Sequence, residues 1–123
     1  MNNYAVLVRV DHSASVYEVD LNNELSSLQK AVDGDIEPIP YYSKGIMLGD
    51  GEAKCKSKDM NLKATMECFP GHLLLPDYIA GDVLILPHSD GPDFLFFSKE
   101  DAEKLAKKMD GPIITKVVPK KTT

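Results

Sequence analysis

Two cysteines and a histidine near the middle of the chain are the residues whose types best suit chemistry. Cys68 and His72 stand four positions apart across a turn, and Cys55 precedes them. Thiolate and imidazole groups are good zinc ligands, but a structural zinc site needs four ligands. The remaining histidines, His12 and His88, lie in other turns without the paired spacing of a zinc motif. The pattern therefore favours two free thiols over a metal site.

The same side chains allow a thiol enzyme in which Cys68 attacks and His72 or His88 acts as the base. Such pairs are defined by geometry, and no orienting acid or family signature surrounds either cysteine. Residues 45–51 contain glycines but lack both the Walker lysine and the dinucleotide-binding spacing. We therefore expect no catalytic residue, no metal and no cofactor, and we keep the thiol enzyme as a third alternative.

A second group of residues suits the binding of a ligand. Our candidate ligand-binding residues are Tyr41, Tyr42, Lys44, Asn61 and Lys63. A tyrosine ring beside a lysine can stack on a base while the ammonium group neutralises a phosphate. Asn61 would then read the polar edges of the ligand, although asparagine also stabilises turns. Because the same residue types make up ordinary protein interfaces, docking of a protein on this region stays open as an alternative.

The composition and charge of the chain limit the class of protein to which it can belong. Its 123 residues suit one domain, and 43% hydrophobic with 27% charged residues is typical of a globular protein. The formal net charge is −5, and Arg9 is the only arginine. Binding to nucleic acid depends on clustered lysine and arginine, so we expect no nucleic-acid partner.

The sequence shows no targeting or membrane segment. Met1–Asn3 lead directly into a strand-like run, without the basic start and apolar stretch of a signal peptide. The longest apolar runs, such as Val83–Leu86, are far shorter than the roughly twenty residues that a bilayer helix needs. We therefore expect a cytoplasmic protein with no membrane partner.

The first third of the chain is predicted to form a hairpin and a helix. Tyr4–Val10 is nearly continuous in its apolar character, which is typical of a central strand covered on both faces. Turn residues separate it from Val16–Val19, which would pair with it. Asn22 or Asn23 can cap a helix that ends at Gly34. The apolar residues at helical spacing are Leu25, Leu28 and Val32.

The middle of the chain is predicted to add a sheet edge and a second hairpin. Ile36–Pro40 alternates like a strand, but its prolines cannot donate to a neighbour and place it at an edge. Gly45–Leu48 would form a strand, Gly49–Gly51 a tight turn, and Glu52–Cys55 an antiparallel return. Between Lys56 and Tyr78 the pattern is irregular, and we assign no element there.

The last third is predicted to contain a hairpin, a helix and a final strand. Asp82–Leu86 reads as a buried strand, with Phe94–Phe97 pairing back on it. Ser98 begins a capping box for a helix, and Ile113–Val118 would add the last strand. The apolar face of this helix comprises Ala102, Leu105, Ala106 and Met109.

Together these elements predict an α+β fold with a mixed, largely antiparallel sheet and two helices on one side. Residues 1–118 would form a single domain, and residues 119–123 a disordered basic tail.

Four short motifs carry a resemblance to a known family: Leu28–Glu37, with a glycine turn before Ile-Glu; the acidic Gly49–Lys54; Lys58–Asn61; and Ile79–Leu84, with Ile-Ala-Gly before a buried strand. They resemble a family of small proteins from phages, plasmids and bacteria that is catalogued as a domain of unknown function. The resemblance extends over residues 4–109, although a leucine follows the asparagine where the family commonly has arginine. It implies a fold and a phage or mobile-element setting, and no catalytic residues.

We therefore expect a non-enzymatic binding module that counters a host process, by sequestering a nucleotide signal of antiviral defence in the host cytoplasm. A homodimer is expected, because a pocket between two subunits can enclose a ligand that one small domain cannot. The alternative is a protein-interaction module that inhibits a host enzyme through the Tyr41–Tyr42 region or an exposed strand at Phe94.

Overall fold

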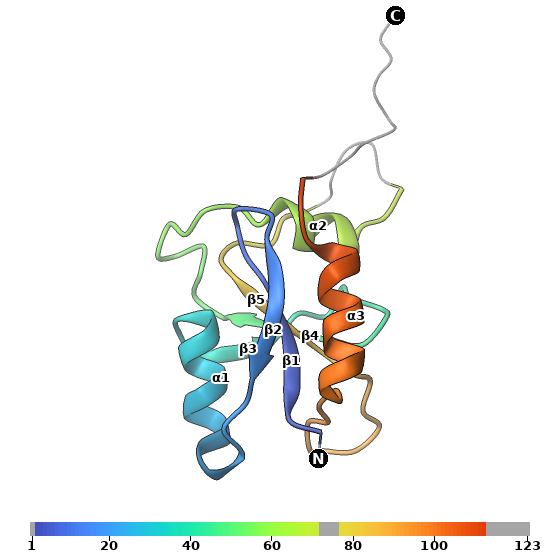
Figure 1. The fold of residues 1–123 in the computed structure, drawn as a ribbon. Helices are drawn as coiled ribbons and strands as arrows, with labels where there is room; N and C mark the ends of the chain where they lie inside the picture. The colour runs from blue at the N-terminus through green and yellow to red at the C-terminus, as the bar shows by residue number, and fades with distance from the viewer. Residues whose placement is uncertain (1, 72–76, 113–123) are drawn as a thin grey trace, which may run out of the picture.

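The computed structural model describes residues 2–71 and 77–112, which form a five-stranded sheet with helices on both faces (Figure 1). The strand order is β2-β1-β5-β4-β3, and every neighbouring pair is antiparallel. The strands are β1 (Tyr4–Val8), β2 (Ala14–Glu18), β3 (Ile36–Pro38), β4 (Ile46–Asp50) and β5 (Val83–Leu86). The helices are α1 (Glu24–Val32), α2 (Leu62–Cys68) and α3 (Lys99–Met109), with a 3-10 turn η1 (Leu21–Asn23) before α1.

The two central strands are apolar on both faces because both faces of the sheet are covered. In β1, Val6 and Val8 face one layer, whereas Ala5 and Leu7 face the other. The four residues of β5 are all buried and divide in the same alternating way. The strand predicted at Tyr4–Val10 and its hairpin with β2 are confirmed, with ends shifted by two residues.

The α+β class and the largely antiparallel sheet are confirmed. Two helices, α2 and α3, lie on one side of the sheet, whereas α1, the first of the two predicted helices, lies on the other. Leu28 and Val32 of α1 pack against one face, whereas Ala102 and Ala106 of α3 pack against the other. Figure 1 shows the sheet nearly edge-on between α1 and α3. The physical reason is that each face of β1 and β5 carries apolar side chains that need cover.

Helix α3 forms as its sequence predicts. The Ser98 side chain accepts a hydrogen bond from the backbone N–H of Asp101 at 3.2 Å and so caps the first turn. Ala102, Ala106 and Met109 are buried, and Leu105 is partly buried beside them.

Helix α1 differs from the prediction in its caps and in one apolar residue. Asp20, not an asparagine side chain, accepts the capping bond of η1, and Asn23 makes no side-chain cap. Asp33 adopts the left-handed conformation at the end of the helix, with φ of 56°, in place of Gly34. Glycine is needed at position 34 on steric grounds, because a Cβ there would lie 2.3 Å from Asp50 Cγ. Leu25 is 58% exposed and does not join the core.

The segment from Ile36 to Cys68 contains two confirmed strands, β3 and β4, one wrong hairpin and one helix that the sequence does not indicate. Strand β3 lies at the sheet edge, where its one proline, Pro38, is tolerated. The hairpin expected at residues 49–55 does not form, because β4 continues through Gly49 and Asp50 and pairs with β3 and β5. The chain then turns, and α2 follows in the stretch to which no element was assigned.

The expected return strand at Phe94–Phe97 is also wrong. Only Phe97 makes a strand-like bridge, and its partner is Tyr4 of β1, not β5. Segment 87–97 crosses the end of the sheet as an irregular loop. The predicted strand at 113–118 and the tail at 119–123 lie outside the described residues. No helix in the described part of the chain has the length and apolar character to cross a membrane.

Candidate functional site

Three of the five candidate binding residues, Tyr42, Lys44 and Lys63, line one groove beside helices α2 and α3, the α2–α3 groove. Its cavity volume is about 340 Å³, within the usual range for small-molecule sites. Tyr42 and Lys44 come from the loop before β4, and Lys63 comes from α2. The other lining residues are Met66, Glu67, Leu105, Lys108, Met109, Asp110 and Pro112.

Tyr42 provides a hydroxyl that stays protonated at physiological pH. Burial raises the pKa of its phenol to about 12, and the nearby Glu67 and Cys68 add to the shift. A neutral phenol both donates and accepts a hydrogen bond. Its partly buried ring also packs against the core. Tyr42 can therefore present an O–H donor to an anion from a fixed position.

The lysines of the α2–α3 groove differ in how strongly the protein already holds them. Lys63 Nζ donates to the backbone carbonyls of His12, at 3.0 Å, and of Met109 and Gly111. It thereby places a positive charge at the carboxyl end of α3, where the helix dipole favours a cation. Lys63 is thus first a structural residue, although it still adds positive potential to the groove.

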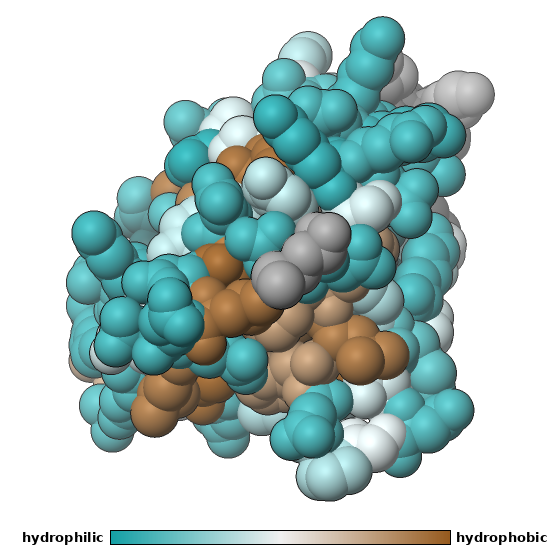
Figure 2. All heavy atoms as spheres, turned by 60° about the horizontal axis from the view of Figure 1, so that its bottom comes forward, coloured by the Kyte–Doolittle hydropathy of each residue, from teal (hydrophilic) through white to brown (hydrophobic). Residues whose placement is uncertain are grey.

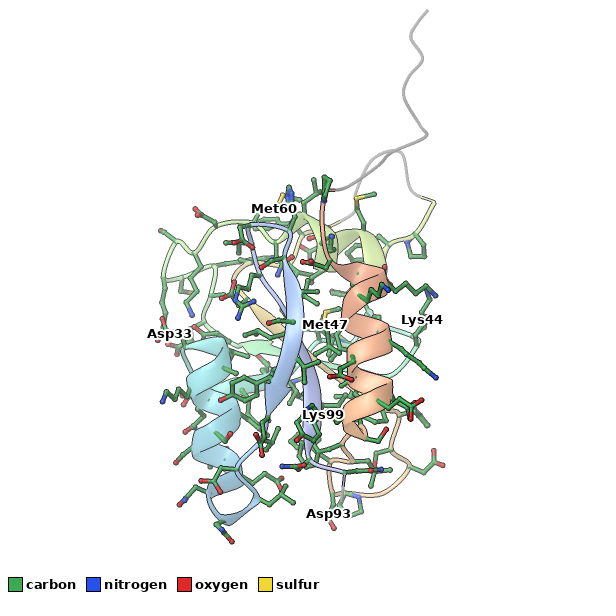
Figure 3. The ribbon with its side chains drawn as sticks, in the orientation of Figure 1. Asp33, Lys44, Met47, Met60, Asp93 and Lys99 are labelled. Atoms are coloured by element: carbon green, nitrogen blue, oxygen red, sulfur yellow. The ribbon has the colours of Figure 1, made fainter. Side chains whose placement is uncertain are left out.

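Lys44 and Lys108 are the more available cations. The side chain of Lys44 is 66% exposed and pairs with Glu67 at 3.6 Å, a distance typical of a weak surface ion pair. Figure 3 shows Lys44 on the α3 side of the sheet. Lys108 is exposed, and no ion pair holds it within residues 2–71 and 77–112. Both ammonium groups can reorient toward a bound anion.

The charge balance of the α2–α3 groove is opposite to that of the whole chain. Three lysines face two carboxylates, those of Glu67 and Asp110, which gives a formal charge of +1. Asp110 is already engaged, because its Oδ1 accepts a hydrogen bond from the Ala14 backbone N–H at 2.8 Å. The groove thus attracts anions in a chain whose net charge is −5.

Tyr41 does not share this groove. It lines a second groove, of about 270 Å³, and is 48% exposed. Its ring lies 5.1 Å from that of Phe69 with a 42° interplanar angle. Across the same groove, Lys54 Nζ bonds to Asp77 at 2.7 Å and lies 4.3 Å from the Tyr78 ring centroid. The hydrogen bond with Asp77 raises the pKa of Lys54.

Asn61 is buried and serves the fold. Its Oδ1 accepts a hydrogen bond from the Ala64 N–H and caps α2, while its Nδ2 donates to the carbonyls of Val8 and Gly81, both at 2.9 Å. Its exposed fraction is 0%. Both amide hydrogens thus have protein partners, and the side chain is engaged by the fold.

The two cysteines and the histidine considered for chemistry do not form a described cluster. Cys55 is exposed, Cys68 is buried, and His72 lies outside the described residues. Burial raises the pKa of the Cys68 thiol to about 11, and Glu67 adds to the shift. Its Sγ lies 3.7 Å from the sulfur of Met47. Since the thiolate is the nucleophilic form, burial and the raised pKa both disfavour reaction of Cys68 at neutral pH. Within residues 2–71 and 77–112, no three His, Cys, Asp or Glu side chains are placed to hold a metal ion.

A buried charge network that the sequence did not indicate joins β4 to the end of α1. The Asp50 carboxylate, 1% exposed, contacts Lys56 at 2.8 Å and Lys58 at 2.9 Å and accepts a hydrogen bond from the Glu52 N–H. Burial alone would raise the pKa of Asp50, but these contacts outweigh it and lower the pKa to about 2. Lys58 also donates to the carbonyls of Val32 and Asp33. The network therefore fixes the end of α1 to the sheet.

The fold and these contacts define a small α+β protein whose helices flank an antiparallel sheet and border a lysine-rimmed groove. The chain belongs to the family described as Domain of unknown function (DUF3846), whose model matches residues 1–110. No curated protein and no solved structure matches the chain.

Proposed function

We propose that this protein is a non-enzymatic binding module whose α2–α3 groove holds a small anionic ligand, with a nucleotide as the expected class. The observation that supports this most is the meeting of Tyr42, Lys44 and Lys108 around one groove with positive formal charge. The apolar side chains of Met66, Leu105 and Met109 line the same groove. A nucleotide matches both parts, because its ring is apolar on its faces and its phosphate is anionic.

In the proposed binding mode, the ammonium groups of Lys44 and Lys108 contact the phosphates. Lys44 exchanges its weak pairing with Glu67 for the stronger charge of a phosphate. The Tyr42 hydroxyl donates a further hydrogen bond, and the ligand ring packs on Leu105 and Met109. No bond is made or broken, so the ligand is held and not converted.

The biological role that we propose is sequestration of a nucleotide signal in the cytoplasm of a host cell by a phage or mobile-element protein. The groove is open on one side, so a second copy of the chain would be needed to enclose the ligand fully. A homodimer is accordingly part of the proposal.

Isothermal titration calorimetry with ADP-ribose and a cyclic dinucleotide tests this function, with tripolyphosphate as a phosphate-only probe. We expect saturable binding of at least one nucleotide at micromolar concentration. The double variant Lys44→Gln/Lys108→Gln should bind it at least tenfold more weakly, since a hydrogen bond to a charged group contributes about 1.5–3 kcal/mol. The matched control Lys99→Gln/Lys104→Gln removes the same charge outside the groove and should bind as the parent does. Absence of nucleotide binding at millimolar concentration, or equal loss in both variants, would contradict the proposal.

A second candidate function is that of a protein-interaction module. A separate observation favours it, namely an exposed apolar surface at the end of the molecule where α1 and α3 begin. This surface does not overlap the α2–α3 groove, so the two functions are testable independently.

A further inference from the structure

An exposed apolar surface, the basal patch, lies where η1 and segment 87–97 meet. It comprises Leu21, Leu25, Pro87, Phe94, Leu95 and Phe96. All but Leu25 line one hollow, of about 670 Å³, and Leu25 lies in the first turn of α1, four positions after Leu21. Figure 2 turns this end of the molecule forward and shows a hydrophobic area surrounded by hydrophilic residues.

The leucines of the basal patch are not explained by packing within the chain. Leu21, Leu25 and Leu95 are 40%, 58% and 52% exposed, whereas Phe94 and Phe96 are partly buried against the α1-side core. Scattered exposed leucines are ordinary, but apolar side chains gathered around one hollow, as Leu21, Phe94 and Leu95 are, mark an interaction site. The phenylalanines anchor the surface to the core, and the leucines present apolar area to a partner.

The charge around the basal patch is strongly negative. Segments 18–25 and 87–101 contain seven acidic residues and one lysine, a formal charge of −6. The rest of the chain has 13 basic and 12 acidic residues, so the net negative charge of the protein comes from these two segments. Asp101 lines the hollow itself, and Asp93 lies at the same end of the molecule (Figure 3).

This charge distinguishes among the surfaces that could cover the patch. Two copies of the chain meeting through it would bring two formal charges of −6 together, which opposes a self-association. The anionic surface of a membrane would be repelled in the same way. A protein segment with lysine or arginine beside its apolar residues has the complementary charge.

We infer that the basal patch is a docking site for a segment of a partner protein that carries apolar anchors flanked by basic side chains. The anchors enter the hollow lined by Phe94, Leu95 and Phe96, and Leu21 of η1 and Leu25 of the first turn of α1 extend the contact. The basic flanks lie against the carboxylates of the two acidic segments. This interaction is independent of the ligand proposed for the α2–α3 groove.

Two synthetic 16-residue peptides test the inference, with the same leucine and phenylalanine positions and either lysine or glutamate at every polar position. The lysine peptide should bind saturably at micromolar concentration, and added salt should weaken it, since surface charge is screened. NMR shift changes should concentrate in residues 18–25 and 87–101. Equal binding of both peptides, or shift changes centred elsewhere, would overturn the inference.

Matched variants separate the basal patch from general attraction to an acidic protein. Leu25→Ser/Leu95→Ser should weaken the lysine peptide at least tenfold, and the exposed positions make misfolding a small risk. Met60→Ser changes another exposed apolar side chain, at the opposite end of the molecule (Figure 3), and should leave binding within twofold. Unchanged binding in the leucine variant would overturn the inference. So would self-association through these residues, or adsorption to vesicles of anionic lipid.

Discussion

Replacing Asn61 with alanine should lower the free energy of unfolding by about 1.5–5 kcal/mol. The magnitude follows from three hydrogen bonds of a fully buried side chain. Loss of the helix cap costs about 0.5–2 kcal/mol, and loss of each of the two hydrogen bonds to the carbonyls of Val8 and Gly81 costs about 0.5–1.5 kcal/mol. The sum is a large fraction of the stability of a small domain.

Urea unfolding followed by circular dichroism measures this loss. The two proteins are compared when the slope of unfolding free energy against urea concentration is the same for both. Asn22→Ala is the matched control, because Asn22 is exposed and its described hydrogen bond uses the backbone N–H. It should change the free energy of unfolding by less than about 0.5 kcal/mol. A loss below about 1 kcal/mol for Asn61→Ala would refute the structural role of this side chain.

The remaining predictions concern the core, the charge network and the thiols. Leu28→Ala should cost about 2–5 kcal/mol and Leu25→Ala less than about 0.5 kcal/mol by the same urea assay, since the first is 1% and the second 58% exposed; similar costs would contradict the placement of α1. The pKa of Asp50 is lowered to about 2 from 3.8, so its stabilising contribution is complete above pH 4 and is lost as pH falls toward 2. Asp50→Asn should remove that part of the acid sensitivity in melts from pH 6 to pH 2, and an unchanged pH profile would contradict the network. A thiol reagent at pH 7 should modify Cys55 rapidly and Cys68 only on unfolding, as followed by mass spectrometry, because Cys68 is buried with its pKa raised to about 11; rapid modification of both would contradict its burial.

Much of the fold could be predicted because its central elements have strong local signals. The apolar runs of β1 and β5 indicate buried strands, and the capping box of α3 indicates the start of a helix. These signals do not depend on the rest of the chain. The placement of α1 and α3 on opposite faces was also implied by the sequence. A strand as apolar as β1 needs cover on both sides, and two helices on one side cannot provide it.

The errors occurred where tertiary contacts override local patterns. Gly49 and Gly51 suggest a tight hairpin, yet Asp50 between them is held by Lys56 and Lys58 from the following turns. Helix α2 has only seven residues, too few to show a clear apolar period. The burial of its cap, Asn61, is likewise not visible in the sequence, where an asparagine near a lysine suggests a ligand contact.

Only part of the candidate site could be predicted, because tertiary contacts bring its residues together. Tyr42, Lys44 and Lys63 meet because the loop before β4 and the helix α2 both reach the carboxyl end of α3. Lys108 joins them from α3, and nothing near it in the sequence distinguishes it from the other lysines of that helix. Tyr41, although adjacent to Tyr42, lines a different groove, so proximity in sequence did not give proximity in the site.

The most direct test of a nucleotide site in the α2–α3 groove is an NMR titration of the full chain with ADP-ribose and a cyclic dinucleotide. The proposal predicts saturable amide shift changes concentrated in residues 42–44, 63–67 and 105–112 for at least one of them. These changes should be lost in Lys44→Gln/Lys108→Gln and kept in Lys99→Gln/Lys104→Gln. Saturable changes centred on another surface, or none at millimolar ligand, would contradict it.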